Sequence, residues 1–314
     1  MALDLLYLRE ALLPLPLVDR PRPVSADDVF PPFEPAPIEA LQEQRIGVIG
    51  SAGSAACVSL VGVARAFEEA GIRPAAISAC SGSVLWGAMW AGGLSAREMA
   101  ALALSWRPQD HLRIQWVGVP RFALSALRGF SGLPKTQALE SLFDRAVWHM
   151  SAGQAEIPLH TLVYNVERGR VEYFGSAQTP DLTLGVLARV AVASPAAESV
   201  RVEGELYVDG GTVDAFPAEP LDAGGAFDRV FGLNVALPAG LEGEQRGRGA
   251  GTVELARRSR RRLGDRLTLI EPVDQSEVRG AAFYDLFLDR RRWPDLMRRG
   301  YEATVEALRP FRRA

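Results

Sequence analysis

Ser81 is the residue whose setting most clearly indicates chemistry. The apolar residues 77–80 are typical of a short strand, and the apolar run Val84–Trp90 is typical of a helix that leaves the serine. A serine on such a strand-to-helix turn exposes its hydroxyl, which is the layout of a nucleophile elbow. The usual pattern is G-x-S-x-G, and here Ala79 and Ser83 replace the two glycines. Small residues are needed at both positions, because the turn brings the strand and helix backbones close together.

A loop of small residues upstream is a second candidate site. Residues 45–49 are typical of a buried strand, residues 50–56 are almost all Gly, Ala or Ser, and a helix is predicted from about Cys57 to Ala70. A helix N-terminus that follows such a loop leaves backbone N–H groups without partners. These groups can bind a phosphate or the oxyanion of acyl transfer. The loop has neither the lysine of a P-loop nor a G-x-G-x-x-G pattern, so nucleotide binding is not favoured.

Asp209 is the candidate acid. It ends a strand pattern and is followed by Gly210 and Gly211. In an α/β-hydrolase triad the order along the chain is serine, acid, histidine. The histidines are His111, His149 and His160, and all three precede Asp209. If Asp209 is the acid, a triad in that order is excluded.

Taken together, the small-residue loop, the serine turn and the Asp-Gly-Gly motif resemble the patatin-like phospholipases, serine acyl hydrolases that use a Ser–Asp dyad. The matching sequence continues through 62–72 after the loop, 87–93 after the serine and 214–217 after the aspartate. The resemblance implies an α/β fold with three layers. In that fold a central, mostly parallel sheet is flanked by helices, and the nucleophile elbow follows a central strand.

The resemblance also implies a role for each residue of the site. Ser81 would be the nucleophile and Asp209 the base, and the N–H groups of Gly53, Ser54 and Gly82 would form the oxyanion hole. The implied substrate is a phospholipid or related acyl lipid, cleaved at a carboxylic ester bond. Neither a cofactor nor a metal is required.

The sequence departs from the family pattern in the oxyanion loop. The family usually has three glycines and then an arginine–glycine pair; this chain keeps only Gly53, and Ala55 or Ala56 takes the place of the arginine. Two alternatives therefore remain open. One is a catalytically degenerate protein that keeps the fold to bind lipids or partners. The other is an acyltransferase with the same dyad.

The domain organisation predicted from composition is a proline-rich N-terminal arm, residues 1–44, and one acyl hydrolase domain, residues 45–314.

The two cysteines, Cys57 and Cys80, are too few for a disulfide framework and favour a reducing, cytoplasmic compartment. Residues 74–96 carry no charge, but their serines and glycines indicate a buried central segment rather than a membrane span. Residues 107–135 contain scattered aromatic residues, which fit either a wall of the acyl-chain site or ordinary core packing.

Charge is distributed unevenly along the chain. The C-terminal arginine-rich region, residues 246–314, has 17 arginines and ten acidic residues, whereas residues 1–44 have three arginines and eight acidic residues. The region could contact anionic lipid headgroups at a membrane surface, or it could be a solvated helix face. The overall charge of −3 and the lack of a recognised binding motif argue against nucleic acid as a partner. The oligomeric state is not indicated.

Overall fold

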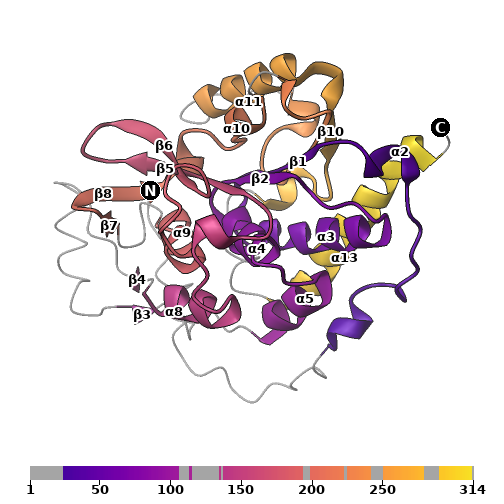
Figure 1. The fold of residues 1–314 in the computed structure, drawn as a ribbon, viewed down its shortest axis with the longest axis horizontal. Coiled ribbons are helices and arrows are strands. Elements are labelled where there is room, and N and C mark those ends of the chain that lie inside the picture. The colour runs from indigo at the N-terminus through magenta and orange to yellow at the C-terminus, as the bar shows by residue number, and fades with distance from the viewer. Residues whose placement is uncertain are drawn as a thin grey trace.

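The computed structural model describes residues 24–105, 113–114, 134–135, 137–193, 199–222, 225–241, 250–278 and 290–312. Within these residues, eight strands form one sheet in the order β10-β9-β1-β2-β5-β8-β7, and β6 pairs with β5 (Figure 1). The strands are β1 (Ile46–Gly50), β2 (Ala76–Ala79), β5 (Leu159–Asn165), β6 (Arg170–Gly175), β7 (Val200–Val202), β8 (Glu205–Asp209), β9 (Arg229–Leu233) and β10 (Leu267–Ile270). A separate two-stranded ladder joins β3 (Arg113–Ile114) to β4 (Pro134–Lys135).

The centre of the sheet is parallel and its β6–β8–β7 side is antiparallel. Strands β10, β9, β1, β2 and β5 pair in parallel, while β6 and β8 run antiparallel to β5 and β7 runs antiparallel to β8. Every residue of β1 and β2 is buried, as expected for parallel strands that are covered on both faces. The predicted mostly parallel central sheet is confirmed. The turn residues Arg168-Gly169 and Glu203-Gly204 predict a hairpin at each position, and the structure has both, as β5–β6 and β7–β8.

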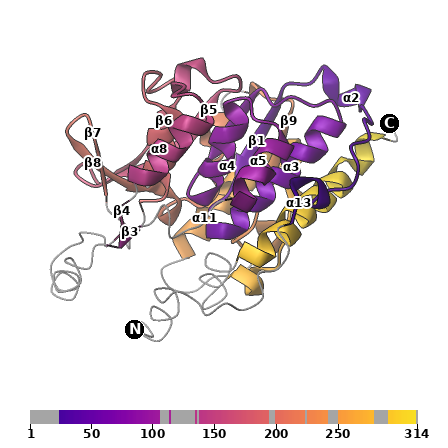
Figure 2. The same cartoon turned by 90° about the horizontal axis from the view of Figure 1, so that it is seen from below.

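Helices cover both faces of the sheet and give the predicted three layers. Helices α3, α4, α5, α8, α9 and α13 lie on one face, and α10 and α11 lie on the other (Figures 1 and 2). Their bounds are α3 (Ser59–Glu69), α4 (Gly82–Ala91), α5 (Ala96–Ser105), α8 (Gln137–Ala146), α9 (Leu184–Ala191), α10 (Glu219–Asp222), α11 (Ala250–Leu263) and α13 (Trp293–Leu308); a short α2 (Glu39–Gln42) precedes β1. Each face has its own apolar core.

The described part of the N-terminal arm, residues 24–44, consists of a 3₁₀ turn, an extended segment and α2, and it packs on α3. Backbone N–H groups of Ala36 and Ile38 donate to the carbonyls of Glu69 and Ala70, at 2.7 and 3.0 Å, and so satisfy acceptors at the C-terminal end of α3. Val29 and Phe30 are buried in the same core as α3. The division of the chain at residue 44 stays a prediction. Residues 1–23, and residues 107–135 apart from the four residues of β3 and β4, lie outside the described residues.

Helices α3 and α13 pack with their backbones in contact. A Cβ atom on Gly62 would lie 2.0 Å from the Met297 carbonyl oxygen and 2.3 Å from the Tyr301 nitrogen. On the facing helix, a Cβ on Gly300 would lie 2.1 Å from the Ser59 carbonyl oxygen. These glycines therefore set the distance between the two helices, and α3 in turn positions the loop before it.

We expect Gly62→Ala to lower the free energy of unfolding by about 3 kcal/mol, because the added methyl group meets backbone atoms that cannot move independently. Denaturant unfolding followed by circular dichroism measures the change. Gly251→Ala is the matched control: Gly251 is also helical, but a Cβ there has no heavy atom within 4 Å. The control should change stability by no more than about 0.5 kcal/mol. Equal effects of the two substitutions would contradict this account of the helix contact.

Candidate functional site

Ser81 occupies the turn between β2 and α4 in a strained backbone conformation. Its φ is 53° and its ψ is −138°, a region that non-glycine residues rarely occupy. Strain of this kind persists where the surrounding structure enforces it, and it is common at active sites. The residue is half-buried, whereas its neighbours Cys80 and Gly82 are buried. The strand, turn and helix predicted around Ser81 are therefore present.

The two residues that replace the elbow glycines are both accommodated at Gly50, the last residue of β1. A Cβ on Gly50 would lie 2.7 Å from the Ser83 Cβ and 3.4 Å from the Ala79 Cβ. Because Gly50 has no side chain, there is space for the side chains of Ser83 and Ala79. The close approach of strand and helix is kept by a glycine on the neighbouring strand.

Asp209 ends β8 next to Ser81. The residue is 5% exposed, and its carboxylate accepts the Gly211 N–H at 2.8 Å. A Cβ on Gly211 would lie 3.1 Å from Asp209 Oδ1, 3.1 Å from the Ala52 Cβ and 3.2 Å from the Ser81 Cβ, so these residues converge around Gly211. The structure therefore brings the two predicted catalytic residues together.

Burial controls the protonation of Asp209. Desolvation raises the pKa of the carboxyl to about 6. The Gly211 N–H, which donates to the carboxylate, and the nearby hydroxyl and N–H of Ser81 act in the opposite direction. A carboxylate with this pKa is a stronger base than an exposed aspartate and is still mostly ionised at neutral pH. It lies beside Ser81, whose hydroxyl carries the proton that a Ser–Asp dyad must move.

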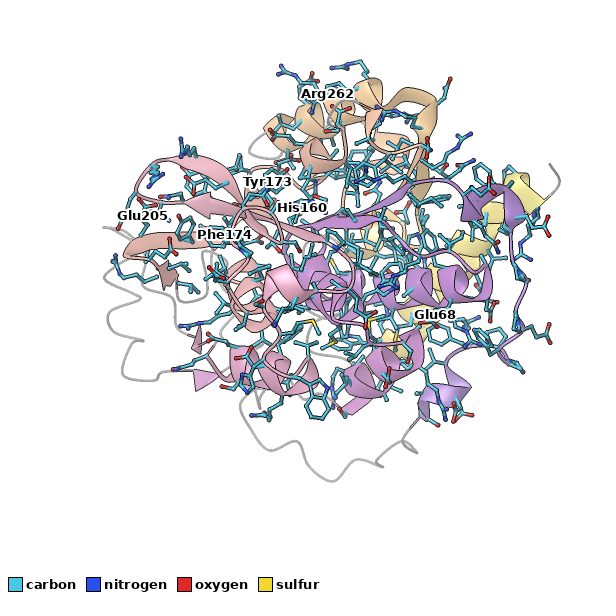
Figure 3. All side chains as sticks on the ribbon, in the orientation of Figure 1. Glu68, His160, Tyr173, Phe174, Glu205 and Arg262 are labelled. Atoms are coloured by element: carbon cyan, nitrogen blue, oxygen red, sulfur yellow. The ribbon has the colours of Figure 1, made fainter. Side chains whose placement is uncertain are left out.

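No histidine takes part in this arrangement among the described residues. His149 Nδ1 lies 3.4 Å from Asp144 Oδ2, at the end of α8. His160 lies on β5 opposite Gly175 of β6 (Figure 3), and burial lowers the pKa of its imidazole. Neither histidine hydrogen-bonds to Ser81 or Asp209, and His111 lies outside the described residues.

The predicted oxyanion loop faces the turn. The 3₁₀ helix η2 (Ser54–Val58) begins at Ser54, whose φ is 51°, and leads directly into α3. A Cβ on Gly82 would lie 2.3 Å from the Ser54 carbonyl oxygen, so the loop and the first residue of α4 are in contact. Within the described chain, the backbone N–H groups of Gly53, Ser54 and Gly82 donate to no protein acceptor. All three predicted donors therefore lie near the Ser81 turn with their N–H groups unengaged.

Sequence reasoning missed Ser51, which fixes the start of this loop. Ser51 is fully buried, its N–H donates to the Leu233 carbonyl at 3.1 Å, and its Oγ accepts the Val235 N–H at 3.1 Å. The loop also packs closely on this segment, since a Cβ on Gly53 would lie 2.2 Å from the Val235 Cγ2. The only signal in the sequence is a serine directly after an apolar strand, which is common in loops.

The two thiols near the site are structural. Cys57 and Cys80 are both fully buried, and burial raises the pKa of each above its usual range, to about 12 for Cys57. A thiol with a raised pKa and no solvent access is a poor nucleophile. Next to Ser81, Cys80 therefore acts as a small buried hydrophobic residue.

A second carboxyl near the site also has a raised pKa. Burial raises the pKa of Asp214 to about 6, against the lowering effect of the Phe216 N–H, which it accepts at 2.9 Å. The charge of Glu219 raises it further, and Arg262 acts in the opposite direction. Because both carboxyls have a pKa of about 6, a measured titration near pH 6 must be assigned to either Asp209 or Asp214.

Much of the arginine-rich region is paired with acidic side chains. On α11, Arg258 and Arg261 lie 3.4 and 3.0 Å from Glu254, and Arg262 lies 3.0 Å from Asp222. Figure 3 shows Arg262 on the α10–α11 side of the sheet, opposite Glu68 on α3. Contact of this region with a membrane stays a prediction.

The described residues lack both a metal-binding cluster and a membrane-spanning helix. They contain no group of three or more His, Cys, Asp or Glu side chains placed to hold a metal ion. Across the same residues, no helix has the length and apolar character needed to cross a membrane.

Comparison with known proteins gives a family and a fold. The family model described as patatin-like phospholipase matches residues 48–222, more than half of the chain. The structure is similar to VipD from Legionella pneumophila, with 15% identity and a TM-score of 0.52 over 88% of this chain and 70% of that one. It is also similar to human GIVD cytosolic phospholipase A2, with 11% identity and a TM-score of 0.52 over 88% of this chain and 61% of the human one. No curated protein matches the sequence significantly.

At these identities the solved structures establish a shared fold, and the chain spans less than two thirds of the human enzyme's length. The family model rests on the sequence itself, and its match contains the small-residue loop, the Ser81 turn and the Asp-Gly-Gly motif. The chain belongs to the patatin-like phospholipase family.

Proposed function

We propose that the protein is a serine lipid acyl hydrolase that cleaves carboxylic ester bonds of phospholipids or related acyl lipids, with Ser81 as nucleophile and Asp209 as base. The observation that carries the proposal is the convergence of Ser81 and the buried Asp209 carboxyl around Gly211, where the pKa of that carboxyl is raised to about 6. The strained backbone of Ser81 supports it, since strain of this kind clusters at active sites.

In the first half of the reaction, Ser81 Oγ attacks the ester carbonyl carbon while Asp209 takes the hydroxyl proton. The carbonyl oxygen becomes an oxyanion, and the N–H groups of Gly53, Ser54 and Gly82 donate to it. The intermediate collapses when the bond to the leaving alcohol breaks. Asp209 then returns its proton to the departing oxygen, which leaves an acyl group on Ser81.

In the second half, Asp209 takes a proton from a water molecule that attacks the acyl carbonyl. The bond to Ser81 Oγ breaks, the serine regains its proton from Asp209, and a fatty acid leaves. Asp209 carries one proton at a time, so one carboxyl can serve both halves. No histidine or metal is needed at any step.

A structural relative suggests a fluorophosphonate as the probe for Ser81. Human GIVD cytosolic phospholipase A2 has been solved in complex with methyl gamma-linolenyl fluorophosphonate, and that structure matches with 14% identity and a TM-score of 0.50. The compound combines a fatty acyl chain with a group that phosphonylates activated serines. It therefore tests nucleophile and lipid preference together.

The first prediction concerns covalent labelling. A long-chain fluorophosphonate should add once to the wild-type protein with loss of fluoride, and peptide mapping should place the adduct on Ser81. Ser81→Ala should give no adduct. Asp209→Asn should label at least ~100-fold more slowly, because the base that activates the hydroxyl is gone. Intact-protein mass spectrometry measures all three.

Circular dichroism and thermal unfolding check that each variant is folded. A folded wild-type protein that takes no adduct would overturn the proposal in favour of a lipid-binding protein without activity. Incubation of a phospholipid with water alone, or with an added alcohol, then separates hydrolase from acyltransferase by product.

The second prediction concerns pH. Asp209 must be ionised to accept the serine proton, so kcat/KM should fall tenfold per pH unit below the pKa of about 6 and level off above it. An exposed aspartate would place this limb near ~4. Turnover of a soluble short-chain ester between pH 4 and 8, in buffers of constant ionic strength, gives the profile.

Asp214→Asn is the control, because Asp214 also has a pKa of about 6. The acid limb should persist in this variant. If Asp214→Asn abolished the acid limb, the limb would reflect the ionisation of Asp214, and the assignment of Asp209 as base would be wrong.

A further inference from the structure

A buried hydrogen bond joins the helix that carries the nucleophile to the oxyanion loop. Ser83, in the first turn of α4, donates from Oγ to the Ser51 carbonyl oxygen at 2.6 Å. Both residues are fully buried. Ser83 stands where the G-x-S-x-G pattern has its second glycine, which has no side chain to make this bond.

The same carbonyl accepts from a second donor. Cys57 Sγ, in η2, lies 3.4 Å from the Ser51 oxygen. Burial raises the pKa of Cys57 to about 12, so its thiol keeps the proton that it donates. The Sγ also lies 3.4 Å from the Cβ position of Gly53 and 3.2 Å from that of Gly82. It therefore packs between residues from both sides of the oxyanion site.

The Ser51 carbonyl is thus the point where three segments meet: the loop after β1, the η2 helix and the start of α4. The loop and η2 supply Gly53 and Ser54, and α4 supplies Gly82. Nothing in the covalent chain fixes the loop donors relative to the Gly82 N–H, because Gly53 and Gly82 are far apart in sequence. The Ser83 hydroxyl supplies a direct link between them.

We propose that Ser83 is a positioning residue, whose hydroxyl holds the nucleophile helix and the oxyanion loop in register through the Ser51 carbonyl. The inference rests on the proposed function. An oxyanion hole works only when its donors already point at the place where the charge develops, and a misplacement of about 1 Å can cost ~100-fold in rate. A glycine at this position has no hydroxyl to donate, so the link between helix and loop depends on a serine.

The experiment compares wild type, Ser83→Ala and Ser83→Gly. Both variants should lose at least ~10-fold in kcat/KM on a soluble ester, with the loss in kcat rather than in KM. Affinity for a fatty trifluoromethyl ketone, which adds to the serine and forms an oxyanion, should fall by the same factor as kcat/KM. Affinity for the corresponding secondary alcohol, which binds without reacting, should stay within about twofold.

Thr304→Val is the matched control. Its hydroxyl donates to the Gly300 carbonyl at 2.6 Å and is also fully buried, but it lies within α13. This variant loses a comparable hydrogen bond and should keep wild-type kcat/KM. Thermal unfolding confirms that all variants are folded at the assay temperature.

Three results would overturn the inference. Wild-type kcat/KM in Ser83→Ala would show that the hydroxyl positions nothing. An equal loss of ketone and alcohol affinity would assign Ser83 a general structural role. A wild-type protein that neither turns over esters nor labels would overturn the proposed function, and this inference with it; in the first two cases the proposed function stands.

Discussion

The register of four neighbouring strands determines where the site can form. Gly50 of β1 lies opposite Ala79 of β2, and Ala79 lies opposite Thr161 of β5. Two residues further along β5, Val163 lies opposite Asp209 at the end of β8. Ser81, two residues beyond Ala79, therefore comes level with Asp209. Side chains alternate between the faces of a sheet, so a slip of one residue in the β5–β8 pairing would send Asp209 to the opposite face. The packed helix layers, down to the backbone contact of α3 with α13, hold this register.

Within that frame, the chemistry depends on a balance between desolvation and hydrogen bonding at one carboxyl. If Asp209 were exposed it would be too weak a base to accept a serine proton at a useful rate. If it were buried without donors, it would tend to stay protonated at neutral pH and accept nothing. The Gly211 N–H and the two donors of Ser81 offset part of the cost of burial, and the remaining shift leaves the pKa at about 6. The same geometry that positions the base therefore also adjusts its strength.

Much of this could be predicted from the sequence, and the exceptions have a common cause. The strand–turn–helix at Ser81, the Asp-Gly-Gly strand end, the parallel core and both hairpins follow from local patterns of apolar, small and turn residues. The Ser51–Ser83 bond and the space that Gly50 leaves for Ser83 do not, because each joins residues about thirty positions apart. In sequence, Ser83 and the replaced glycines of the oxyanion loop look only like departures from the family motif. In three dimensions, a glycine on the adjacent strand accommodates the change. The burial of Asp209 likewise depends on several segments at once.

The most direct measurement is a titration of the Asp209 carboxyl itself. In protein labelled with ¹³C at aspartate side-chain carboxyls, NMR between pH 3 and 9 should show two signals with midpoints near 6, one from Asp209 and one from Asp214. Asp209→Asn should remove one of them, and Asp214→Asn should remove the other. This result would establish a buried, ionisable carboxyl poised beside Ser81. If the signal lost in Asp209→Asn instead titrated near ~3.9, as an exposed aspartate does, the carboxyl would not be the strengthened base that this account requires.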